Sequence, residues 1–176
     1  MPDQTITGGC LCGSVRFEVK DRFLYAGYCH CSQCRRFSGA ASTPLGGIAT
    51  EDLKITSGAD KLSKYVKSPA TTLAFCSVCG SSLYAEKPLF KTLHVRFGSL
   101  DRAPKLLPAA HMYVSSAPSW APIVDDLPQF DDLADPATRA KFMSQFSGIF
   151  AHMQLTLPEV DASDPSPSPP VRAEES

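Results

Sequence analysis

The stretch Cys29-His30-Cys31-Ser32-Gln33-Cys34 places three thiols within six residues. Two further clusters, Cys10-Leu11-Cys12 and Cys76-Ser77-Val78-Cys79, hold the other four cysteines of this 176-residue chain. Cysteines two or three positions apart can direct their sulfurs at one point from a tight turn, and such thiolate sets select zinc, copper(I) or iron–sulfur clusters. Buried free cysteines that act as small hydrophobic residues would not be expected to fall into three clusters. The spacing therefore predicts metal binding.

The odd number of cysteines argues against a disulfide framework. Seven thiols cannot all pair, and residues 1–5 show no basic stretch followed by an apolar core, as a secretory signal would. A cytoplasmic location is therefore expected. No apolar run approaches the ~18 residues of a membrane-spanning helix, so no membrane is expected as a partner.

Composition and charge indicate one globular domain followed by a tail. Hydrophobic residues make up 43% of the chain and charged residues 20%, which excludes a fully disordered protein. The net charge of −1 argues against nucleic-acid binding by bulk electrostatics. Residues 158–176 hold five prolines and carry a net charge of −4, which predicts a disordered acidic tail. Residues 1–157 carry the remaining +3 and form the predicted domain.

Short runs that alternate apolar and polar residues dominate this domain. Residues 15–19 alternate with period two, as a half-buried strand does. Gly-, Pro- and Ser-containing breaks, among them Gly46-Gly47, separate the runs and predict a mainly β fold of antiparallel sheets. One C-terminal helix is predicted near 136–150, where apolar residues recur at helical spacing after the candidate N-cap Asp135. The other predicted strands are 53–55, 64–66, 72–75, 83–85, 93–97 and 111–114.

The seven thiols divide naturally into four and three, with redox-inert zinc as the expected metal. The two outer clusters would close one structural site and clamp segments that are distant in the chain, with the ligands Cys10, Cys12, Cys76 and Cys79. The dense cluster would leave one position of a second zinc open, with the ligands Cys29, Cys31 and Cys34. An exogenous thiolate suits that open position. A competing partition adds one outer cysteine to the dense cluster and leaves an odd thiol.

Three segments resemble the glutathione-dependent formaldehyde-activating enzyme family, which includes the domain of centromere protein V. They are GGCLCGSVRF at 8–17, CHCSQCRRFSG at 29–39 and FCSVCGSSL at 75–83. The stretches APSW at 117–120 and DLPQF at 126–130 are also similar to the family's C-terminal pattern. The resemblance covers roughly residues 6–132 and leaves out the predicted helix and tail.

This resemblance implies an Mss4-like β fold clamped by zinc, with two zinc ions per chain divided as above. It also implies a carbon–sulfur lyase that joins glutathione, or another small thiol, to an aldehyde such as formaldehyde and gives S-(hydroxymethyl)glutathione. Cys29, Cys31 and Cys34 would hold the catalytic zinc, beside which the thiolate and the aldehyde would meet. Two alternatives stay open: a noncatalytic zinc-stabilised binding module, and a sensor of zinc or thiols that uses the exposed cluster.

Four further residues are candidate substrate contacts. Arg35 and Arg36 follow the dense cluster and could hold a carboxylate of glutathione, although surface arginines are the simpler interpretation. Ser38, next to a glycine, could let a ligand approach closely. Trp120 could act as a lid, with packing in the core as the favoured interpretation.

Three histidines have simpler interpretations. His30 lies between two cysteines and is expected to face solvent in a turn, with proton transfer or metal ligation as the alternatives. His94 and His111 are expected to be ordinary core or surface residues of strands.

Overall fold

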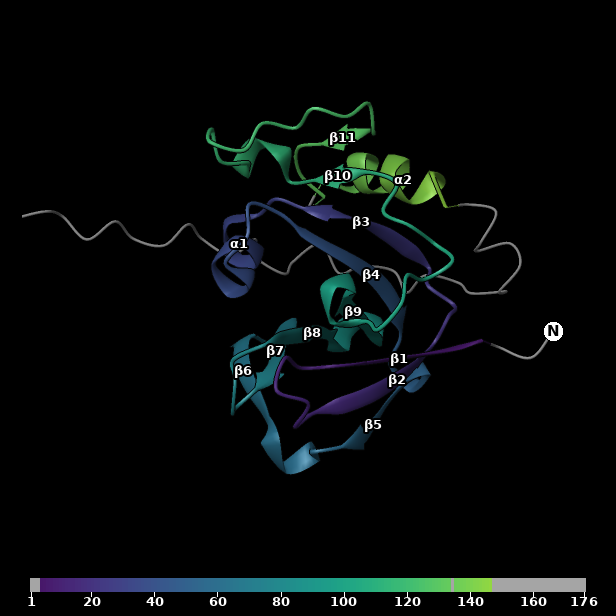
Figure 1. Ribbon diagram of the computed structural model, residues 1–176. Helices are drawn as coiled ribbons and strands as arrows, with labels where there is room; N and C mark the ends of the chain where they lie inside the picture. The colour runs from purple at the N-terminus through teal and green to yellow at the C-terminus, as the bar shows by residue number, and fades with distance from the viewer. Residues whose placement is uncertain (1–3, 134, 147–176) are drawn as a thin grey trace, which may run out of the picture.

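The computed structural model describes residues 4–133 and 135–146, whose strands form two sheets (Figure 1). The smaller sheet has the order β1-β2-β5, with β1 Thr5–Gly9, β2 Arg16–Lys20 and β5 Leu53–Ser57. The larger sheet has the order β11-β10-β3-β4-β9-β8-β7-β6. Its strands are β3 Tyr25–Cys29, β4 Thr43–Ala49, β6 Leu62–Ser68, β7 Thr71–Cys76, β8 Ser82–Lys87, β9 Thr92–Arg96, β10 His111–Met112 and β11 Gln129–Phe130.

Helical structure is limited in the described residues. Two α-helices are present, α1 Ser32–Ser38 and α2 Pro136–Ser144. Short 3-10 helices connect strands at Thr50–Asp52, Ala59–Lys61, Pro88–Phe90, Phe97–Ser99 and Val114–Ser116. No helix of this part of the chain is long and apolar enough to cross a membrane.

The prediction of a mainly β protein with one C-terminal helix is confirmed. The predicted strand runs fall in or beside β2 and β5 to β10, and their pairings within the two sheets are antiparallel except at one edge. There, β10 pairs in parallel with both β3 and β11. A long connection leads into β10, and a parallel neighbour requires such a crossover. The sheet is therefore mixed at that edge.

The prediction that Gly46-Gly47 marks a break between strands is wrong, because both glycines lie inside β4. Their lack of side chains makes room for aromatic rings. A Cβ at Gly46 would lie 2.5 Å from the Phe23 ring, and one at Gly47 would lie 2.3 Å from the Tyr25 ring. Glycine inside a strand often marks such a close approach, and sequence reading alone does not separate it from a turn.

One hydrophobic core joins the two sheets. Apolar side chains of the smaller sheet meet those of the larger one, and the largest fully buried members are Ile6, Phe17, Ile48, Leu83, Val15, Val19 and Val95. Burying each such side chain contributes about 1.5–3 kcal/mol. This packing holds the β1–β2 turn against the β7–β8 turn, where four cysteines lie.

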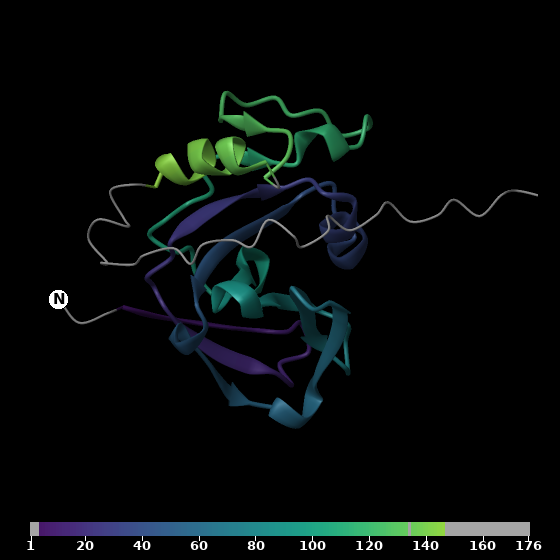
Figure 2. The same ribbon diagram turned by 180° about the vertical axis from the view of Figure 1, so that it is seen from behind.

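A second core lies under α2, which covers β3 and β4 from the side opposite the smaller sheet (Figures 1 and 2). Phe142 and Phe146 pack against Leu45 and Met112. As predicted, the Asp135 carboxylate caps the helix by accepting a hydrogen bond of 2.7 Å from the backbone N–H of Thr138. The helix ends at Ser144, whereas the prediction extends to 150; residues 147–150 and the predicted tail 158–176 lie outside the described residues.

Candidate metal centres

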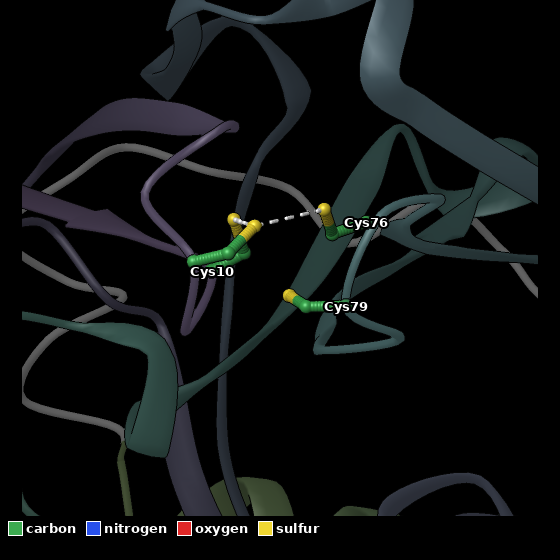
Figure 3. Close-up of side chains that lie close together, drawn as sticks. Cys10, Cys76 and Cys79 are labelled. Atoms are coloured by element: carbon green, nitrogen blue, oxygen red, sulfur yellow. Dashed lines mark hydrogen bonds between the residues drawn. The ribbon is translucent and has the colours of Figure 1, made fainter.

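Four sulfurs from two hairpins converge at the junction of the sheets. Cys10 and Cys12 lie between β1 and β2, and Cys76 and Cys79 lie at the turn between β7 and β8. All four Sγ atoms lie within 4.8 Å of one another. Figure 3 shows Cys10, Cys76 and Cys79 turned toward one another from the two segments. We call this set the four-cysteine group.

Each half of this group is closed by a turn that ends in a glycine. Gly13 donates a backbone hydrogen bond of 3.1 Å to the Cys10 carbonyl, and Gly80 donates one of 2.9 Å to the Cys76 carbonyl. Both glycines have a left-handed φ, of 77° and 74° respectively, which favours glycine over other residues. Each turn therefore curls its two cysteines toward the same point.

The four-cysteine group fits a tetrahedral zinc ion. Zinc–sulfur bonds of about 2.3 Å in a tetrahedron place the sulfurs about 3.8 Å apart. The Cys10–Cys12 and Cys12–Cys76 sulfur separations are 3.5 and 3.9 Å. A hydrogen bond with the Ser81 hydroxyl lowers the pKa of Cys79 to about 5, whereas burial raises the pKa of Cys76 to about 11. The donor set and its spacing are those of a closed thiolate site.

Three further sulfurs form the second set, which we call the three-cysteine group: Cys29, Cys31 and Cys34. Their Sγ atoms also lie within 4.8 Å of one another, and no fourth His, Cys, Asp or Glu joins them in the described part of the chain. Cys29 ends β3, and Cys31 is the N-cap of α1, where its sulfur accepts a hydrogen bond of 3.3 Å from the Cys34 N–H. What sequence reading treats as a dense turn is thus a strand end followed by a short helix.

The three-cysteine group shares negative charge unevenly. Hydrogen bonds with Cys29 and Cys34 lower the pKa of Cys31. The hydrogen bond between Cys31 and Cys29 raises the pKa of Cys29. Cys31 is half-buried, whereas Cys29 is 4% exposed. Cys31 is therefore the most acidic thiol of this group, and it is more exposed than Cys29.

The expectation that His30 faces solvent is wrong, because only 4% of its surface is exposed. Its Nε2 lies 2.8 Å from Nδ1 of His111, whose Nε2 lies 2.9 Å from the Asp125 carboxylate. Tyr28 stacks on the His111 ring, with 5.2 Å between the centroids. His111 is thus a buried link between the segment of the three-cysteine group and the loop that carries Asp125.

Replacing His111 by leucine should destabilise the protein by about 1–3 kcal/mol, because it leaves the buried His30 Nε2 without its partner. Urea unfolding measures this loss. The matched variant Asp125→Asn should have a smaller effect, since the Asp125 side chain is 49% exposed. Equal losses of unfolding free energy in the two variants would contradict a stabilising contact between His30 and His111.

Sequence reading missed Arg96, which lies beside the three-cysteine group. This β9 residue is 5% exposed, and its Nη1 lies 3.9 Å from the Cys34 Sγ. Its guanidinium lies 5.8 Å from the centroid of the Phe37 ring. No motif signals Arg96, because only strand pairing brings it to α1.

The predicted substrate contacts differ in exposure, and three of the four lie on α1. Arg35 is half-buried, while Arg36 and Ser38 are exposed. The favoured interpretation of Trp120 as a core residue is wrong, since 72% of its surface is exposed. His94 agrees with its simple interpretation: its Nε2 lies 2.6 Å from the Tyr25 hydroxyl.

Fold and cysteine geometry together define a class of β protein with two thiolate groups able to hold metal ions. Residues 5–116 match the model of the family described as glutathione-dependent formaldehyde-activating enzyme. The chain belongs to this family.

Three named proteins and one crystal structure are similar to this chain. A Fusarium vanettenii protein is 30% identical over 162 residues, which cover 87% of this chain and 80% of the relative. Proteins of Aspergillus flavus and Aspergillus oryzae are each 31% identical over 87 residues, so the match spans about half the length of each. All three carry the name "putative glutathione-dependent formaldehyde-activating enzyme". A Rhodobacter sphaeroides crystal structure, 28% identical, gives a TM-score of 0.47 and covers 56% of this chain and 91% of its own.

Proposed function

We propose that this protein is a zinc-dependent enzyme of the carbon–sulfur lyase type, which forms or cleaves the S-hydroxymethyl adduct of glutathione, or of another small thiol, with formaldehyde. One observation carries the proposal: the three-cysteine group has three converging sulfurs and no fourth protein ligand among the described residues. Such a set leaves a metal open to substrate. The family description supplies the thiol and the aldehyde.

In this proposal the two cysteine groups hold one zinc ion each and have different tasks. The four-cysteine group cross-links the two sheets, and the three-cysteine group serves the reaction. Bound zinc would supply a Lewis acid that keeps a substrate thiol deprotonated. Arg96, beside Cys34, adds positive charge that favours an anionic thiolate.

The reaction itself needs no oxidant or reductant. The thiolate sulfur forms a bond to the carbonyl carbon, and the C=O π electrons move to the oxygen, which takes up a proton. The reverse reaction breaks the same C–S bond. Holding both reactants in one site replaces a bimolecular encounter, and this proximity is the main advantage that the protein can provide.

The direct test measures how fast glutathione, formaldehyde and their adduct reach equilibrium, by NMR exchange spectroscopy with zinc-loaded protein. We expect exchange faster than in protein-free buffer, and two zinc ions per chain. One zinc with three reactive thiols would favour the sensor. No acceleration with any small thiol would favour the binding module.

The cysteines also support the proposed cytoplasmic location. All seven lie in the described part of the chain, and all are free. Free clustered thiols persist in reducing compartments.

A further inference from the structure

A cavity of about 460 Å³ lies between the four-cysteine group and the loop that follows α1. Its wall includes Cys10, Ser38 at the end of α1, Arg96 on β9 and Gly98 in the 3-10 helix Phe97–Ser99. Small-molecule sites typically occupy about 300–1,000 Å³. Arg96 contacts the Cys34 sulfur, and Thr43, another residue of the cavity wall, donates a hydrogen bond to the Cys34 carbonyl, so the cavity adjoins the three-cysteine group.

Arg96 is a buried cation without a carboxylate partner among residues 4–133 and 135–146. Its Nε is buried and has no hydrogen-bond partner there, and its guanidinium contacts the Cys34 sulfur and the Phe37 ring. Arginine is almost never fully buried unless it is paired, because removing its charge from water is costly. One long contact to sulfur leaves most of the guanidinium donors available. An anion in the cavity would complete its pairing.

The other groups of the cavity point to the same chemistry. Arg16 also lines it, but Asp101 already pairs with that guanidinium and accepts a further hydrogen bond of 2.6 Å from Thr7. The Ser82 hydroxyl, a second lining group, is buried and has no partner within the described residues. Beside the Cys34 sulfur, the cavity therefore offers a guanidinium without a carboxylate partner among the described residues and one unpaired hydroxyl, which suit a carboxylate with neighbouring amide groups.

We propose that this cavity binds the carboxylate-bearing part of the thiol substrate, with the Arg96 guanidinium receiving the carboxylate. The inference rests on the function proposed above, since it assigns the recognition of that same substrate. It gives the thiol a second point of attachment besides its sulfur. Arg96 thus takes the role that the sequence suggests for Arg35 and Arg36, neither of which lines the cavity.

S-methylglutathione tests this site apart from metal ligation, because it keeps both carboxylates and has no free thiol. Calorimetric titration of zinc-loaded protein should detect its binding. Arg96→Gln should weaken that binding at least about tenfold. The dimethyl ester of the same compound should bind wild-type protein at least about tenfold more weakly.

A second variant blocks the cavity without touching Cys34. A Cβ at Gly98 would meet no atom within 4 Å and its φ is not in the left-handed region, so Gly98→Leu should fill the cavity without backbone strain. It should abolish S-methylglutathione binding and keep the wild-type zinc content. Arg102→Gln is the matched control, because Arg102 is exposed and is not part of the cavity wall. Its affinity should stay within about twofold of wild type.

The outcomes separate this inference from the proposed function. Equal binding of acid and ester, wild-type affinity in Gly98→Leu, or no binding to wild-type protein would overturn the cavity assignment, even if the exchange of formaldehyde with glutathione is accelerated. Binding that Gly98→Leu removes, without any such acceleration, would support the cavity and reject the enzymatic proposal.

Discussion

Replacing Cys31 by serine should lower the rate of adduct exchange more than about 100-fold and leave the protein folded. Loss of residues that merely support metal ligands costs about 10–100-fold, so loss of a ligand should cost more. Cys31 also carries the most stable thiolate of the three-cysteine group, since hydrogen bonds with Cys29 and Cys34 lower its pKa. NMR exchange measures the rate, and circular dichroism and the Tm report the fold.

Stability should change little because Cys31 is half-buried at the start of a helix of seven residues. Gln33→Ala, in the same helix, is the control and should keep both activity and Tm. The zinc content of Cys31→Ser should fall from two ions per chain toward one. A variant that unfolds, or one that retains wild-type exchange, would contradict the assignment of Cys31 to a catalytic site.

Replacing Cys79 by serine, in contrast, should mainly lower the stability of the fold. Cys79 belongs to the group that joins the β1–β2 hairpin of one sheet to the β7–β8 hairpin of the other. Metal binding by such a group contributes directly to folding free energy. We expect the Tm to fall by more than about 10 °C, and a zinc chelator to produce a similar loss in wild-type protein.

Neighbours in the same turns provide matched controls for this variant. Leu11 lies between Cys10 and Cys12 and is 90% exposed, and Val78 lies between Cys76 and Cys79 and is 58% exposed. Leu11→Ser and Val78→Ser change side chains in the turns without removing a sulfur, so their Tm should stay near that of wild type. A Cys79→Ser protein with wild-type Tm would show that the four-cysteine group does not clamp the sheets.

Part of the fold could be predicted because its signal is local. Strands such as β2 face the core on one side only, so their sequences alternate, and Asp135 caps α2 through a side chain three residues from its partner. The sequence does not predict strand β4, because its two glycines resemble a turn. In the structure their lack of side chains makes room for the rings of Phe23 and Tyr25. Those rings come from a different strand and a different loop, which no window of sequence brings together.

The candidate site also combines features that local sequence predicts with features that depend on tertiary contacts. Spacing identified the seven cysteines and the arrangement in which the structure groups their sulfurs, while their metals and roles stay predictions. The sequence predicts a solvent-exposed His30 because its immediate neighbours form a turn-like segment. Its burial comes from β10, whose parallel pairing with β3 brings His111 against it.

The thiolate chemistry of this protein follows from local spacing, because two sulfurs in one turn reach a common point whatever the rest of the chain does. The surroundings of those sulfurs depend on tertiary contacts. The pairing of β9 with β4 and β8 places Arg96 between Cys34 and the cavity, and the packing of the two sheets brings four cysteines from distant hairpins together. Burial and charge compensation depend on neighbours that are distant in sequence, so they follow from packing and not from spacing.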